Sequence, residues 1–125
     1  MDIGLRDEIA FSIGKKQSST IQTVDIWLDS VLITYFDNSA YLPTFVHSLK
    51  RELEDIENGL IHGDYVFFDH GPTTDDVVAH AKLIGNEICV NCELDSGSKV
   101  SVKLPISTII AIYKNCIDLL SINAT

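Results

Sequence analysis

The sequence contains no apolar run long enough to cross a membrane. Its longest runs extend over a handful of residues, as at 109–113 ("IIAIY"), whereas a membrane-spanning helix needs about 20. The first residues, "MDIGLRDEIAF", carry acids where a signal peptide carries positive charge, and no long apolar segment follows them. We therefore expect a cytoplasmic protein with no membrane partner.

Cysteine and proline are also scarce, with three of each among 125 residues. An odd number of cysteines in a chain of this length fits a reducing compartment better than a disulfide scaffold. Cys89 and Cys92 have C-x-x-C spacing, but no second pair or clustered histidine follows as in a zinc site, so we expect no bound metal. With 46% hydrophobic and 22% charged residues, the composition predicts one globular domain over residues 1–125.

Several common catalytic motifs are missing. There is no G-x-S-x-G nucleophile elbow, and the seven glycines form neither a phosphate-binding loop nor a dinucleotide-binding pattern. We therefore expect no cofactor and no enzyme activity.

Basic residues are few and unevenly placed. Nine lysines and arginines face eighteen aspartates and glutamates, which gives a formal charge of −9. Residues 25–76 contain eleven acids and two bases, while the remaining segments contain seven of each, so one block holds the whole net charge. Because phosphate binding needs clustered Lys and Arg, this distribution argues against nucleic acid as a partner. It favours a basic protein partner, or solubility alone.

The first half of the chain changes from strand to helix spacing. Alternating hydrophobic residues over 8–14, 19–29 and 31–37 predict three strands, the last two joined by a turn at Asp29-Ser30. Helical spacing over 42–56 predicts an amphipathic helix, capped by Asn38 or Ser39 and stopped by Gly59. Pro43 suits its first turn. Its outward face is expected to carry a mostly acidic cluster, composed of Lys50, Arg51, Glu52, Glu54, Asp55 and Glu57.

The second half of the sequence predicts a β-meander. A short strand at 64–68 precedes a hairpin of 77–84 and 87–94, with Gly85-Asn86 as its turn. This register pairs Ala81 with Val90 and places His80 on the face away from the apolar set.

A third meander strand and a second helix complete the predicted fold. A loop at 96–98 would bring Leu94 opposite Val100 and Cys92 opposite Val102. After Pro105, helical spacing predicts a helix that covers the sheet. The order βββ-α-ββββ-α therefore predicts an α+β fold, with a mainly antiparallel sheet of about seven strands and two covering helices.

The segment 67–78, "FFDHGPTTDDVV", concentrates titratable residues and allows three interpretations. A metal or acid/base site would use Asp69, His70, Asp75 and Asp76, since carboxylates and imidazole suit divalent metals. A plain turn is the second interpretation, because Gly71-Pro72 interrupts regular structure. The third is part of an acidic recognition surface, because loops held by a rigid sheet often carry binding residues.

The segments "VDIWLDSVLITYFDNSAYLPTFVHSL" and "YVFFDHGPTTDD", within residues 20–78, resemble bacterial immunity proteins of contact-dependent growth inhibition systems. The resemblance implies a role without catalysis, in which the protein binds and neutralises a cognate toxin domain, often a basic nuclease. An acidic surface would speed the encounter by electrostatic steering.

We therefore predict an immunity protein that binds a toxin domain through acidic residues. The alternatives are a small metal-dependent hydrolase that uses the 69–76 loop, and an adaptor subunit without catalysis. The charge distribution alone supplies the predicted contact residues, which are Asp37, Glu52, Asp55, Asp64, Asp69, His70, Asp75 and Asp76.

Overall fold

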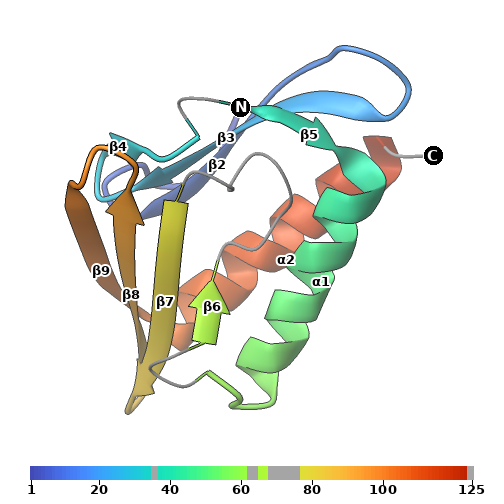
Figure 1. Cartoon of the computed structure of the whole chain (residues 1–125). Helices are drawn as coiled ribbons and strands as arrows, with labels where there is room; N and C mark the ends of the chain where they lie inside the picture. Colours follow the sequence, from blue (N-terminus) through green and yellow to red (C-terminus); the bar gives the residue numbers. More distant parts are fainter. Residues whose placement is uncertain (35–36, 62–64, 68–76, 124–125) are drawn as a thin grey trace.

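The computed structural model describes residues 1–34, 37–61, 65–67 and 77–123, which form two antiparallel sheets and two helices (Figure 1). The first sheet contains β1 (Asp2–Gly4), β2 (Ile9–Lys16), β3 (Ile21–Leu28), β4 (Val31–Leu32) and β5 (Ser39–Tyr41). The second contains β6 (Tyr65–Phe67), β7 (Val77–Ile84), β8 (Glu87–Leu94) and β9 (Lys99–Pro105). The helices are α1 (Leu42–Glu57) and α2 (Ile106–Asn123). The α+β class with antiparallel pairing is confirmed, but the described strands form two sheets instead of one.

The β2–β3 pair forms the centre of the first sheet. Alternation puts Phe11 opposite Ile26, and both side chains are fully buried. The turn into β4 follows the prediction, since Asp29 and Ser30 have positive φ angles of 51° and 64° and Leu28 pairs with Val31. Two left-handed residues give a turn whose twist matches the flanking strands.

The strand expected at 31–37 is shorter than predicted. The Ile33 N–H still donates to the Ile26 carbonyl at 2.9 Å, but the Ile26 N–H donates to the Thr34 hydroxyl at 3.1 Å instead of to a carbonyl. Thr34 is buried, and its hydroxyl donates in turn to Asp25 at 3.0 Å. A side chain therefore replaces the next backbone partner, and β4 ends at Leu32.

Residues 39–41 also differ from the prediction. They form β5, which pairs with the first half of β3, so neither Asn38 nor Ser39 caps the helix. The N-cap is Tyr41, which makes no side-chain capping bond, and Pro43 lies in the first turn as predicted. At the other end, Gly59 has φ +69°, as a left-handed helix stop requires.

The β7–β8 hairpin has the predicted register, including Ala81 opposite Val90 and Val77 opposite Leu94. The predicted β8–β9 register is wrong by two residues, because Cys92 pairs with Val100. The loop is 95–97 instead of 96–98, since Gly97, at φ 88°, takes the left-handed position that a three-residue hairpin loop needs. A shift of two residues keeps each side chain on its predicted face.

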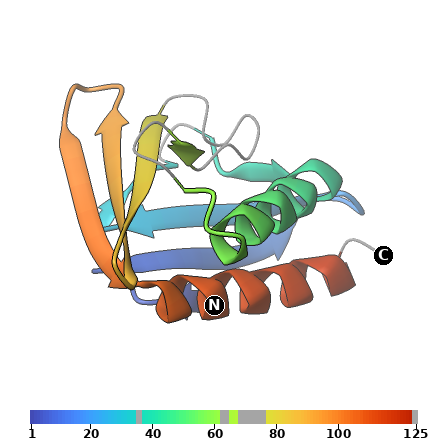
Figure 2. The same cartoon turned by 90° about the horizontal axis from the view of Figure 1, so that it is seen from below.

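One hydrophobic cluster joins both sheets and both helices. Figure 2 shows α1 and α2 side by side, with the second sheet at one end of the first. Helix α2 contacts α1, β1, β2 and β9, and its first N–H, from Ile106, donates to the Asn86 carbonyl at 2.8 Å. Within the described residues, neither helix has the length and apolar character that a bilayer crossing demands.

The three cysteines provide a test of this core. Cys92 and Cys116 are buried, and burial raises the pKa of their thiols to about 11 and about 12, whereas Cys89 is half-exposed. Because the thiolate is the reactive form, we expect Cys89 alone to react rapidly with an aromatic disulfide reagent in the native protein. All three thiols should react in denaturant. A Cys89→Ser variant that still reacts rapidly when folded would contradict this placement.

Candidate functional site

Five of the eight predicted contact residues, Asp64, Asp69, His70, Asp75 and Asp76, lie outside the described residues. The 67–78 segment and its hydrolase interpretation therefore fall almost entirely outside the structure's description. The remaining three predicted residues are Asp37, Glu52 and Asp55. Glu52 and Asp55 lie on α1, Asp37 lies just before β5, and the three have different surroundings.

Glu52 does not lie on the outward face of α1 as predicted. It is 0% exposed, and its Oε1 accepts a hydrogen bond of 2.6 Å from the hydroxyl of Tyr113 on α2. Helical spacing could have indicated this position, because Glu52 lies between Leu49 and Ile56 on the buried stripe. The assignment of Glu52 to a partner-binding surface is therefore wrong.

Tyr113 lies at the centre of an aromatic group. Its ring is 5.7 Å from that of Phe11 and 6.0 Å from that of Phe67, and its side chain is fully buried. Burial raises the pKa of Tyr113 well above its ordinary value, and the nearby Glu52 raises it further. The phenol therefore stays protonated and keeps donating to Glu52.

Most described acids of the 25–76 block also hold contacts within the fold. Five of its seven described acids have a hydrogen bond or an ion pair inside the molecule. The pairs join Asp25 to the Thr34 hydroxyl, Asp37 to the Ser39 N–H, Glu52 to Tyr113, Asp55 to the Tyr65 hydroxyl, and Glu57 to Lys114. The described part of the acidic block is therefore not one unoccupied binding face.

In the parts of the chain that the structure describes, the second sheet instead has a face that no helix or other strand covers. One side of it packs on the core through residues such as Ala81 and Val90. The opposite side, here named the outer sheet face, consists of Val66, Val78, His80, Lys82, Ile84, Glu87, Cys89, Asn91, Glu93, Lys99, Ser101 and Lys103. Three large hydrophobic side chains remain well exposed there, with Val66 at 57%, Val78 at 58% and Ile84 at 45%.

The charge of the outer sheet face differs from that of the whole chain. It carries three lysines and two glutamates, whereas the chain has a net charge of −9. Lys103 pairs with Glu87 at 3.9 Å. The face is therefore nearly neutral and combines apolar side chains with polar ones.

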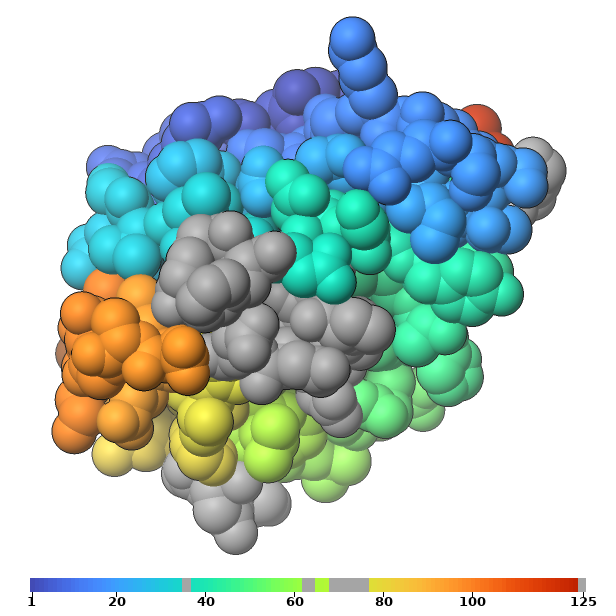
Figure 3. All heavy atoms as spheres, turned by 45° about the horizontal axis from the view of Figure 1, so that its top comes forward, coloured from blue at the N-terminus to red at the C-terminus, as the bar shows by residue number. Residues whose placement is uncertain are grey.

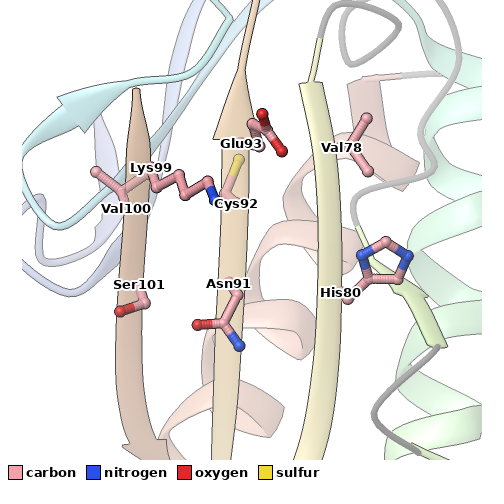
Figure 4. A pocket seen from close by; sticks show the side chains of 8 residues that line it. All are labelled: Val78, His80, Asn91, Cys92, Glu93, Lys99, Val100 and Ser101. Atoms are coloured by element: carbon pink, nitrogen blue, oxygen red, sulfur yellow. The ribbon is translucent and has the colours of Figure 1, made fainter. Parts of the chain in front are cut away.

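A shallow pocket of about 310 Å³ lies in this face, over β7, β8 and β9 (Figure 4). Its lining includes the side chains of Val78, His80, Asn91, Glu93, Lys99 and Ser101. The prediction that His80 points away from the apolar set is confirmed, because its neighbours Ala79 and Ala81 are buried. The β8–β9 turn, at one end of these strands, lies beside β4 on the surface (Figure 3).

The C-x-x-C pair does not form a joint metal site. Cys89 and Cys92 are three residues apart on β8, so their side chains point to opposite faces of the sheet. Across the parts of the chain that the structure describes, no cluster of three potential metal ligands occurs.

Comparison with known proteins adds no homologue to this geometry, since no protein-family model, curated protein or solved structure matches the chain. The outer sheet face was not among the predicted contact sites. Strand alternation placed His80 and Cys89 on one face of the sheet, but the sequence did not indicate that this face lacks a cover.

The buried Tyr113–Glu52 pair provides a test of the interior. A Tyr113→Phe substitution removes a hydroxyl donor from a buried carboxylate, so we expect the free energy of unfolding to fall by about 1–3 kcal/mol. Urea denaturation measures this change. Tyr41→Phe is the matched control, because Tyr41 is 48% exposed and should change stability by less than about 0.5 kcal/mol. Equal losses in both variants would contradict a special role for the pair.

Alkaline pH should weaken the same contact. The pKa of Tyr113 is raised in the folded chain, whereas an unfolded tyrosine titrates near pH ~10. Above that pH the folded state binds more protons than the unfolded state, so stability falls as pH rises. We expect Tyr113→Phe to show a smaller loss than the unmodified protein in urea melts between pH ~9 and ~11. Parallel curves for the two proteins would show that Tyr113 does not cause the loss.

Proposed function

We propose that this chain is an immunity protein without catalytic activity, which binds and neutralises a cognate toxin domain through its outer sheet face. One observation carries the proposal: the face is uncovered in the described structure and exposes Val66, Val78 and Ile84 among polar side chains. Protein interfaces commonly combine an apolar centre with a polar rim.

Exposed apolar side chains on this face support its choice: Val66 and Val78 are diagonal neighbours, and Ile84 lies further along β7 on the same side. Of the eight large hydrophobic residues that are exposed in the described structure, three lie on this one side of one sheet. Single exposed apolar residues need no explanation, whereas a group on one rigid surface is typical of an interaction site. The strands hold the three side chains in fixed positions, which reduces the entropy lost on binding.

The net charge supports a basic partner. A formal charge of −9 produces a long-range field that attracts a positively charged protein and raises the rate of encounter. The nearly neutral outer sheet face would then make the close contacts. Steering and contact are thus assigned to different parts of the protein.

Co-expression tests the role directly. The proposal predicts that a large secreted protein is encoded immediately upstream of this chain, and its C-terminal domain is then the toxin probe. We expect bacteria that express this domain to grow only when the chain is co-expressed, and the two purified proteins to form a complex. Growth arrest in spite of abundant folded chain would overturn the proposal.

Substitutions on the outer sheet face test the contact surface. The double variant Val66→Asp with Val78→Asp places charge where apolar contact is expected, so affinity for the toxin domain should fall at least about tenfold. Leu5→Asp is the matched control, because Leu5 is 60% exposed and lies on the loop after β1. Titration calorimetry gives the affinities, and circular dichroism confirms folding. Equal weakening by both variants would exclude this face as the specific contact.

A further inference from the structure

We propose that the pocket in the outer sheet face binds a carboxylate, presented by a glutamate or aspartate in an extended segment of the protein partner. This inference rests on the proposed function for the source of the carboxylate. The site itself is defined by residues of this chain alone.

The pocket brings hydrogen-bond donors from three strands together. His80 on β7, Asn91 on β8 and Ser101 on β9 are direct cross-strand neighbours, and they point to the same side of the sheet. Adjacent members of this row have Cβ atoms about 5 Å apart, so Asn91 can share a small ligand group with either neighbour, whereas His80 and Ser101 are about 10 Å apart. Lys99 lies two residues from Ser101 on β9 and adds a positive charge (Figure 4).

These donors have few partners within the protein. The described contacts give His80, Lys99 and Ser101 no side-chain hydrogen bond or ion pair, and Asn91 only a weak one, at 3.9 Å to the Cys89 Sγ. Lys103 on the same strand, by contrast, has Glu87 as an ionic partner. The polar groups of the pocket therefore remain available to a ligand.

The chemistry of the lining favours a carboxylate over other anions. An ionised carboxylate accepts several hydrogen bonds and gains strength from a nearby cation, here Lys99. Glu93 lies directly opposite Lys99 and also lines the pocket, so its charge opposes a doubly charged anion more strongly than a singly charged one. A singly charged carboxylate fits this balance.

The surroundings favour a carboxylate that belongs to a peptide. Val78 lines the same pocket and is 58% exposed, so an apolar side chain beside the acid would find a contact there. A volume of about 310 Å³ accepts one side chain with its neighbouring backbone, but not a folded domain. An extended segment with an acid between apolar residues matches both features.

Two tripeptides test the site in the whole chain, without the toxin. The probe is acetyl-Val-Glu-Val-amide, and the control is acetyl-Val-Gln-Val-amide, which has the same shape but no charge. In nitrogen-15 NMR spectra we expect the acidic peptide to cause saturable shifts at the amides of His80, Asn91 and Ser101. The neutral peptide should bind at least about fivefold more weakly, because it loses the charge-assisted hydrogen bonds. Equal binding of the two peptides would overturn the proposal.

Variants and a second anion sharpen the result. Asn91→Ala with Lys99→Gln should weaken the acidic peptide at least about fivefold, whereas Lys82→Gln, on the same face but outside the pocket, should not. Ser101→Ala is a milder substitution for the same purpose if the double variant does not fold. Inorganic phosphate that causes the same saturable shifts would overturn the assignment to carboxylates.

The outcomes separate this site from the proposed function. Peptide binding by a chain that gives no protection against the toxin would leave the carboxylate site standing and refute the immunity role. Protection by a chain that does not distinguish the two peptides would refute the site alone.

Discussion

The hydrogen bond between Tyr113 and Glu52 is the contact on which the arrangement of the molecule depends. It joins the two helices inside the hydrophobic cluster, between residues 61 positions apart. A buried carboxylate is costly unless it has hydrogen-bond partners, and the packing of α2 beside α1 supplies Glu52 with one, the Tyr113 hydroxyl. Because α2 also contacts β1, β2 and β9, this packing extends to both sheets. The position of the outer sheet face thus follows from an interaction on the far side of the second sheet.

The elements with strong local signals could be predicted from the sequence. Gly85-Asn86 set the β7–β8 register, and Pro43 and Gly59 marked the ends of α1. The β8–β9 register failed locally, because the three-residue loop was placed one residue too late, but two other predictions failed where a distant partner decided the outcome. The Thr34 hydroxyl took the place of a backbone carbonyl, and the phenol of Tyr113 allowed Glu52 to enter the core. Neither partner can be read from hydrophobic spacing, which records where apolar residues lie but not which polar groups meet.

For the candidate site too, local sequence signals predicted some features, while contacts between distant residues decided others. Counting charges identified an acidic block, but it could not separate acids that hold the fold from acids that face solvent. Asp55, for example, accepts a hydrogen bond of 2.5 Å from Tyr65 and so attaches β6 to α1. The outer sheet face, in contrast, was not predicted at all, because none of its residues is unusual when considered singly. Only the pairing of three strands puts His80, Asn91 and Ser101 in one row, and only the tertiary arrangement of the described elements leaves that row uncovered by any of them.

The interrupted edge of the first sheet affects whether the chain associates with itself at high concentration. A long edge strand offers a row of unpaired backbone groups to which a second chain can add. Beside β3 that row is divided between the short strands β4 and β5. At the end of the other sheet, two β9 strands paired about Ser101 would set Lys99 of each against Lys103 of the other, and like charges in that position are destabilising. Both features oppose self-association of the chain through these two sheet edges.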